Sequence, residues 1–98
     1  MAARSKAIVI HERDNVATAI KPLEAGTTVS LDIQGRPEKI KIRSPIPMGH
    51  KFALGDIEAG ADVVKYGEPI GMTTARISRG EHVHVHNVVS HRGRKVGA

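Results

Sequence analysis

Short apolar runs, separated by glycines and prolines, predict strands along most of the chain. Residues 7–10 (AIVI) and 16–20 (VATAI) are rich in β-branched side chains, which favour extended backbone. Residues 39–43 (KIKIR) alternate polar and apolar positions, the pattern of a half-buried strand. A Pro-Gly turn leads into a short strand at residues 51–54, and HVHVHNVV from residue 82 repeats the alternation. With ten glycines and five prolines, few windows are long enough for a stable helix.

Three segments share one frame: an aliphatic residue, two residues, a glycine, two residues and a valine. They are LEAGTTV (23–29), IEAGADV (57–63) and ISRGEHV (77–83). The frame predicts a turn that closes at a glycine with positive φ, followed by a strand whose valine points inward. Short helical or 3₁₀ turns are expected near residues 22–25 and 56–59. The fold class is therefore mainly β, a small domain of short strands with one or two short helical turns.

Composition limits the protein to one small domain, with residues 7–89 as its folded body and residues 1–6 and 90–98 as tails. Only Phe52 and Tyr66 are aromatic, so Val, Ile, Leu and Ala must form the core. The absence of cysteine excludes disulfides and leaves His, Asp and Glu as the metal ligands. No apolar run approaches the roughly 20 residues that span a bilayer, and no signal-peptide core follows Met1. We expect a cytoplasmic protein without a membrane segment.

The net charge of +5 belongs to the two ends of the chain. Residues 7–89 contain ten Lys or Arg and ten Asp or Glu, so the body is neutral. The excess comes from five residues near the termini: Arg4, Lys6, Arg92, Arg94 and Lys95. A surface that binds phosphates needs positive charge spread over the fold, and stacking on bases needs more rings than two. Nucleic-acid binding is therefore not expected.

The segment HVHVHN, residues 82–87, holds three of the six histidines at alternate positions. In a strand, His82, His84 and His86 share one face, with successive Cβ atoms about 7 Å apart, while Val83 and Val85 point inward. A His-x-His pair can converge on one metal ion, and a third ligand usually comes from elsewhere. Histidine also titrates near neutral pH and can transfer protons. A solvated outer face of an edge strand is the alternative interpretation.

Other polar residues carry weaker signals. His50 and Lys51 form a polar pair in a loop after Gly49, where binding residues are often found. His11 is expected to be a hydrogen-bonded residue at a strand end, and His91 lies in the basic tail. Tyr66 is expected to bury its ring with the hydroxyl at the rim of the core, with a catalytic phenol as the alternative.

Two stretches, HERDNVATAI (11–20) and GHKFALGDIEAGADVVKYGEPIGMTTARISRGEHVHVHN (49–87), together resemble the N-terminal domain of the altronate and galactarate dehydratase family. The resemblance implies the SAF fold, a small β-clip. In that family a large C-terminal region carries much of the active site, and this chain stops soon after HVHVHN. We therefore expect the small subunit of a split enzyme, or a separated domain. The small subunit of sulfolactate sulfo-lyase is similar in length and motif.

The resemblance implies a hydro-lyase that eliminates water from a sugar acid and is inactive without a large catalytic subunit. It also implies a divalent metal, Fe(II), held mainly with that subunit. The implied catalytic residues are His84 and His86. The substrate carboxylate would be bound by His50, Lys51 and Asn87. The implied metal ligands are His82, His84 and His86.

Alternatives remain open at this point. The chain could serve a sulfolactate sulfo-lyase, with sulfite as the leaving group, or bind carbohydrates or carboxylates without catalysis. An exposed, histidine-rich edge strand also invites pairing, so a homo-oligomer is a further possibility.

Overall fold

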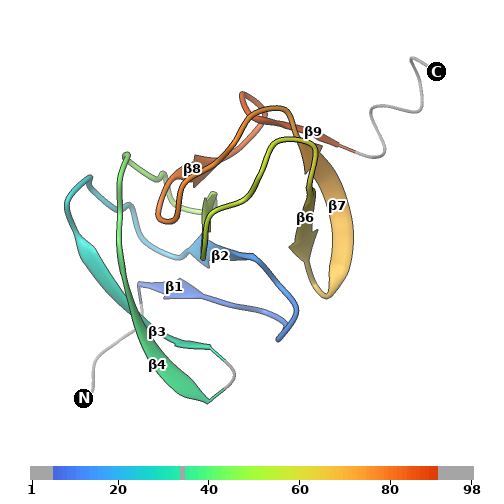
Figure 1. Ribbon diagram of the computed structural model, residues 1–98. Coiled ribbons are helices and arrows are strands. Elements are labelled where there is room, and N and C mark those ends of the chain that lie inside the picture. Colours follow the sequence, from blue (N-terminus) through green and yellow to red (C-terminus); the bar gives the residue numbers. More distant parts are fainter. Residues whose placement is uncertain (1–5, 34, 91–98) are drawn as a thin grey trace.

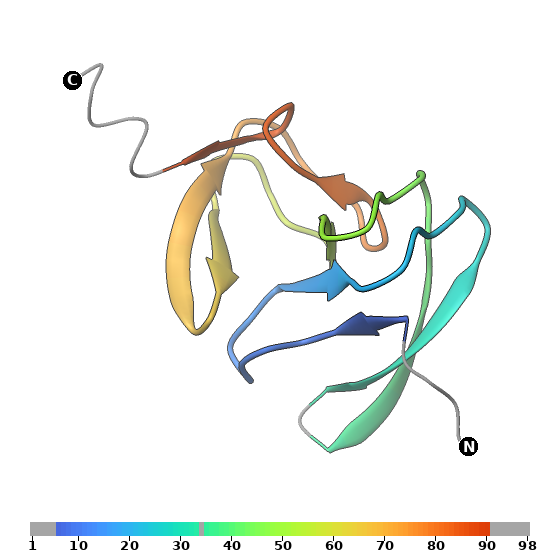
Figure 2. The same ribbon diagram turned by 180° about the vertical axis from the view of Figure 1, so that it is seen from behind.

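Antiparallel pairing between short strands organises the whole domain (Figures 1 and 2). The computed structural model describes residues 6–33 and 35–90, so His91 and most of both expected tails lie outside the described residues. Within these ranges all regular elements are strands, which confirms the mainly β prediction, and no helix there could cross a membrane. The strands are β1 (Ala7–Ile8), β2 (Val16–Ala19), β3 (Thr28–Ile33), β4 (Arg36–Lys41), β5 (Lys51–Ala53), β6 (Asp62–Lys65), β7 (Glu68–Thr73), β8 (His82–Val83) and β9 (Val88–Ser90).

Three sheets share the strands. The central sheet has the order β1-β2-β5-β8, a second is the β3-β4 hairpin, and a third has the order β6-β7-β9. In both views the β3-β4 ribbon lies on one side of the central sheet and the β6-β7-β9 sheet on the other (Figures 1 and 2). Strands distant in sequence therefore meet, and the segment between β8 and β9 connects the central sheet to the third sheet.

The repeated glycine frame forms the turn that the sequence predicts, and it occurs four times in the described residues. In each turn the residue after the glycine donates its N–H to the carbonyl three residues earlier, and the glycine has φ between 80° and 92°. A positive φ at the third residue but not at the second is typical of a type II turn, and it favours glycine at the third position. The four glycines are Gly26, Gly49, Gly60 and Gly80.

The fourth copy, residues 46–52 (IPMGHKF), carries Phe52 where the other three carry valine. The aliphatic residues that begin the frames pair across the molecule as isolated bridges, Leu23 with Ile46 and Ile57 with Ile77. The short helical turns expected near residues 22–25 and 56–59 are therefore wrong. Leu23 and Ile57 form bridges instead, and a type II turn begins at the residue after each of them.

Apolar side chains form two buried clusters, built almost entirely of aliphatic residues as composition predicts. Phe52 is the exception and is completely buried. The prediction of a buried Tyr66 ring is wrong, because Tyr66 is 58% exposed at the turn between β6 and β7. The first cluster contains Ala7, Ala17, Ala19, Leu23, Val29, Leu31, Ile40, Ile42, Ile46 and Phe52, and the second contains Val16, Ala53, Ile57, Val63, Ile77 and Val83.

Candidate metal centre

The histidine segment is a strand only at its start. β8 ends at Val83, and residues 84–87 form a turn, so the expected continuous strand is wrong. The side chain of Asn87 explains the turn: its Oδ1 accepts the His84 N–H at 2.9 Å, and its Nδ2 donates to the His82 carbonyl at 2.9 Å. Such local bonds compete with a strand ladder. Val83 is buried as predicted, but Val85 is 81% exposed at the turn, contrary to the prediction.

Antiparallel pairing brings a fourth histidine to this segment. β5 pairs with β8 so that Lys51 lies opposite Val83 and Phe52 opposite His82. Continuing this register by one residue places His50, which directly follows the Gly49 turn, across from His84. The rings of His50 and His84 stack with centroids 4.2 Å apart. The sequence predicts His50 only as a substrate-binding residue, because its neighbours depend on pairing between distant strands.

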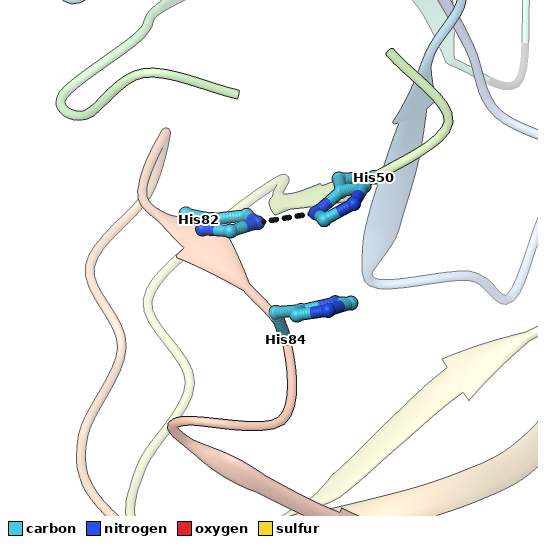
Figure 3. Close-up of side chains that lie close together, drawn as sticks. All are labelled: His50, His82 and His84. Atoms are coloured by element: carbon cyan, nitrogen blue, oxygen red, sulfur yellow. Dashed lines mark hydrogen bonds between the residues drawn. The ribbon is translucent and has the colours of Figure 1, made fainter. Parts of the chain in front are cut away.

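Three imidazoles converge in this arrangement (Figure 3). The Nδ1 of His50 and the Nε2 of His82 are 2.9 Å apart and share a hydrogen bond. One ring nitrogen from each of His50, His82 and His84 lies within 4.8 Å of the others. Neutral imidazole is a common ligand of divalent transition metals, at bond lengths of about 2.0–2.1 Å for zinc. These three residues therefore fit a metal ion that draws their nitrogens together.

His86 stands apart from this trio. Its ring centroid lies 5.2 Å from that of His82, at a tilt of 38°, and its side chain is exposed in the turn. It is not among the described residues whose ligand atoms converge. The ligand set predicted from the sequence thus shares His82 and His84 with the set that the geometry assembles, which has His50 in place of His86.

The electrostatics favour neutral imidazoles. Burial, followed by positive charge on neighbouring histidines and on Lys51, lowers the pKa of His82 to about 4. The same kinds of cause, with burial again the largest, lower the pKa of His84. Histidine must be deprotonated to bind a metal, so these shifts prepare both residues as ligands at neutral pH. Burial, and then the charge of Lys65, lowers the pKa of Lys51.

A cavity of about 560 Å³ adjoins the trio. His84 and Lys51 line it, so one imidazole of the trio faces a space of the size that binds small molecules. The rest of its wall comes from β7, β9 and the turns beside them. The lining residues are Lys51, Tyr66, Pro69, Ile70, His84, Val85, Val88 and Ser90.

Two further predicted residues have structural partners. The side-chain amide oxygen and nitrogen of the buried Asn87 both bond the backbone of the histidine segment. Its role in binding the substrate carboxylate stays a prediction. The Nδ1 of His11 accepts the N–H of Arg13 at 3.1 Å, which matches the expected hydrogen-bonded histidine near a strand end.

Comparison with known proteins decides the family. Residues 5–91 match the family described as the altronate/galactarate dehydratase SAF domain. The chain belongs to this family. Altronate dehydratase of Escherichia coli is 51% identical to the SAF domain over 80 residues, which are 82% of this chain and 15% of that protein. The chain thus spans about 15% of the length of the altronate dehydratases it matches.

A shorter relative matches over nearly its whole length. The (2R)-sulfolactate sulfo-lyase subunit alpha of Chromohalobacter salexigens is 36% identical over 89 residues, covering 86% of this chain and 94% of that protein. Galactarate dehydratase (L-threo-forming) of Escherichia coli is 37% identical over 78 residues, which are 14% of its length. The SAF domain is therefore similar both to a small part of large dehydratases and to a separate lyase subunit.

The depressed pKa of His82 predicts that acid destabilises the SAF domain. Between pH 6.5 and about 4 the unfolded state binds a proton at this site and the folded state does not, so stability falls as pH falls through that window. Urea unfolding should show a lower midpoint at about pH 5 than at about pH 7. His82→Gln, which cannot take up this proton, should show a smaller decrease. An equal decrease in both proteins would rule out His82 as a source of the acid sensitivity.

Proposed function

We propose that the SAF domain contributes a metal-binding half of a β-elimination site in a sugar-acid dehydratase, with the other half supplied by a large partner chain. The convergence of His50, His82 and His84 beside the cavity carries this proposal. It is supported by relatives that are named as dehydratases and as a sulfo-lyase, all of which are lyases. The word subunit in the names of the two sulfo-lyase relatives supports a partner chain.

The proposed reaction removes water from a hydroxy acid. A base takes the proton on the carbon next to the carboxylate, the electron pair of that C–H bond forms a C=C bond, and the β C–O bond breaks. The leaving hydroxyl takes a proton from an acid and departs as water. A divalent metal, when bound, supplies a Lewis acid that stabilises negative charge on the substrate carboxylate. Imidazole ligands suit iron as well as zinc, so the trio fits the proposed Fe(II).

The chain's own residues divide the work in this proposal. His50, His82 and His84 hold the metal, with His84 also facing the cavity. His86 is exposed beside the trio and can move a proton to or from the substrate, as general acids and bases do. The amine of Lys51 lines the cavity and binds the carboxylate. The remaining acid or base belongs to the partner chain.

The relatives, which are metabolic enzymes, support the proposal of a cytoplasmic location.

Two substrate classes have separate support. Identity of 51% with an altronate dehydratase favours a sugar acid with water as the leaving group. The match to 94% of a sulfo-lyase subunit favours sulfolactate with sulfite as the leaving group. We place the sugar acid first because its relative is the more similar in sequence.

A chimera tests the proposal. Residues 5–91 would replace the matching segment of the E. coli altronate dehydratase, and turnover of altronate, galactarate and sulfolactate would be measured. We expect the isolated SAF domain to be inactive and the chimera to dehydrate a sugar acid. His86→Ala in the chimera should lower kcat by about 10²- to 10⁴-fold, the usual contribution of a general acid or base, with metal content unchanged. A chimera that stays fully active with both His84→Ala and His86→Ala would refute the role of this segment. Tight binding of a sugar acid to the isolated domain, without activity in the chimera, would indicate a binding module.

A further inference from the structure

The turn between β6 and β7 has an unusual residue. Tyr66 has φ of 61°, and it is the one non-glycine residue with positive φ among those described. Gly67 follows with φ of 73°, so both central residues of this two-residue hairpin turn are left-handed. Such turns favour Asn-Gly or Gly-Gly, because a bulky side chain strains the backbone there. Backbone strain of this kind is concentrated at functional sites.

A buried carboxylate holds the turn in place. Oδ1 of Asp14 accepts the N–H of Gly67 at 2.9 Å, and its Oδ2 accepts the N–H of His11 at 3.0 Å. Asp14 is only 8% exposed. The side chain of its neighbour Asn15 bonds the backbone of β6 twice, accepting from the Val64 N–H at 2.8 Å and donating to the Asp62 carbonyl at 3.0 Å. The loop between β1 and β2 therefore fixes the β6-β7 hairpin to the central sheet.

This support presents the Tyr66 ring to the cavity and not to the core. Tyr66 lines the cavity together with Lys51 and His84, and more than half of its surface remains exposed. The Nζ of Lys65 lies 4.9 Å from the centre of its ring. Among the described residues, the lining combines a lysine, a histidine, a tyrosine and a serine with four apolar residues, and it includes no Asp or Glu. Such a set suits a ligand that carries both a carboxylate and hydroxyl groups.

We propose that Tyr66 is a substrate-contacting residue whose phenol hydrogen-bonds hydroxyls of the sugar-acid chain. Asp14 is a positioning residue that acts through the turn. The inference takes the class of its ligand, a sugar acid, from the proposed function. It differs from that proposal in the residues that carry it, because neither Tyr66 nor Asp14 belongs to the metal trio or moves a proton.

The aromatic composition makes a direct test possible. Tyr66 is the chain's only tyrosine and tryptophan is absent, so intrinsic fluorescence reports on this residue alone. Galactarate would be titrated into the isolated SAF domain, followed by fluorescence and by NMR of the two aromatic rings. The buried ring of Phe52 is the internal control for folding. We expect saturable changes at Tyr66 with no change at Phe52.

Two variants complete the test. Tyr66→Phe keeps the ring but loses the hydroxyl, and it should weaken galactarate binding about three- to tenfold, the effect of one hydrogen bond. Asp14→Asn should also weaken binding, but should add little in the Tyr66→Phe background, because it acts through the same contact. That non-additivity separates positioning from a general loss of stability.

Three results would overturn the inference: no saturable binding of galactarate, binding that leaves Tyr66 unperturbed, or unchanged affinity in Tyr66→Phe. Failure of the proposed function has a different signature. A chimera that needs no histidine of the 82–86 segment would refute that function, even with Tyr66 responding to galactarate. Histidine-dependent turnover with an indifferent Tyr66 would refute only the inference.

Discussion

His50→Ala is expected to lower the affinity of the SAF domain for Zn²⁺ or Fe²⁺ by more than the roughly 10- to 100-fold that outer-shell changes cause. The reason is that this residue supplies one of three converging nitrogens and comes from a separate segment of the chain, directly before β5. His86→Ala should leave the affinity nearly unchanged, because that imidazole lies outside the converging set. The two variants therefore distinguish the ligand set of the structure from the one that alternation in HVHVHN predicts.

Metal affinity would be measured by titration calorimetry on protein purified without an affinity tag, after removal of metal by a chelator. His86→Ala is the matched control, since it removes the same side chain from the same histidine cluster. The opposite ranking, with His86→Ala weak and His50→Ala tight, would show that the ligands are His82, His84 and His86. The circular dichroism spectrum of each variant would verify that it folds.

Gly80→Ala is expected to remove a large part of the protein's stability. Gly80 has φ of 85°, and a Cβ at this position would overlap the carbonyl oxygen of Lys41. The backbone of Gly80 is also fixed by bonds to Ala53 and Arg43, so it has little room to shift. Left-handed strain of about 1–2 kcal/mol adds to overpacking of about 1–3 kcal/mol. The expected loss of about 2–5 kcal/mol is a large part of the stability of a small domain.

The control is Gly60→Ala, in the same type of turn. Its φ is 80°, but nothing lies within 4 Å of an added Cβ, so only the backbone strain of about 1–2 kcal/mol should remain. Urea unfolding of both variants measures the difference. Equal losses would mean that the Lys41 carbonyl yields easily and that the two turns are equivalent in packing.

The short strands and glycine turns could be predicted because their causes are local. The frame of seven residues contains both the glycine that takes positive φ and the valine that points inward. Three copies of it can therefore be recognised in the sequence. The fourth copy is hidden because Phe52 replaces the valine, and it is the copy that positions His50. The predicted metal set lacks His50 for this reason.

The turn within the histidine segment could not be predicted from the alternation of histidine and valine. Period-two spacing predicts a strand through Val88, but the amide of Asn87 bonds both His84 and the His82 carbonyl and turns the chain after Val83. The position of Tyr66 was equally hidden, because its exposure depends on how Asp14 anchors a hairpin some fifty residues later in the chain. The resemblance predicted the family. The cavity could not be predicted, because it forms only when β5, β7 and β9 pack together.

The central claim is a metal site made by His82 in β8, His84 directly after it and His50 directly before β5. Its most direct test is an anomalous-scattering map of the zinc-loaded domain. We predict one strong peak at about 2.0–2.1 Å from a ring nitrogen of each of His50, His82 and His84. A peak bound by His86 without His50, or no peak near the trio while His50 and His82 keep their hydrogen bond, would contradict the account.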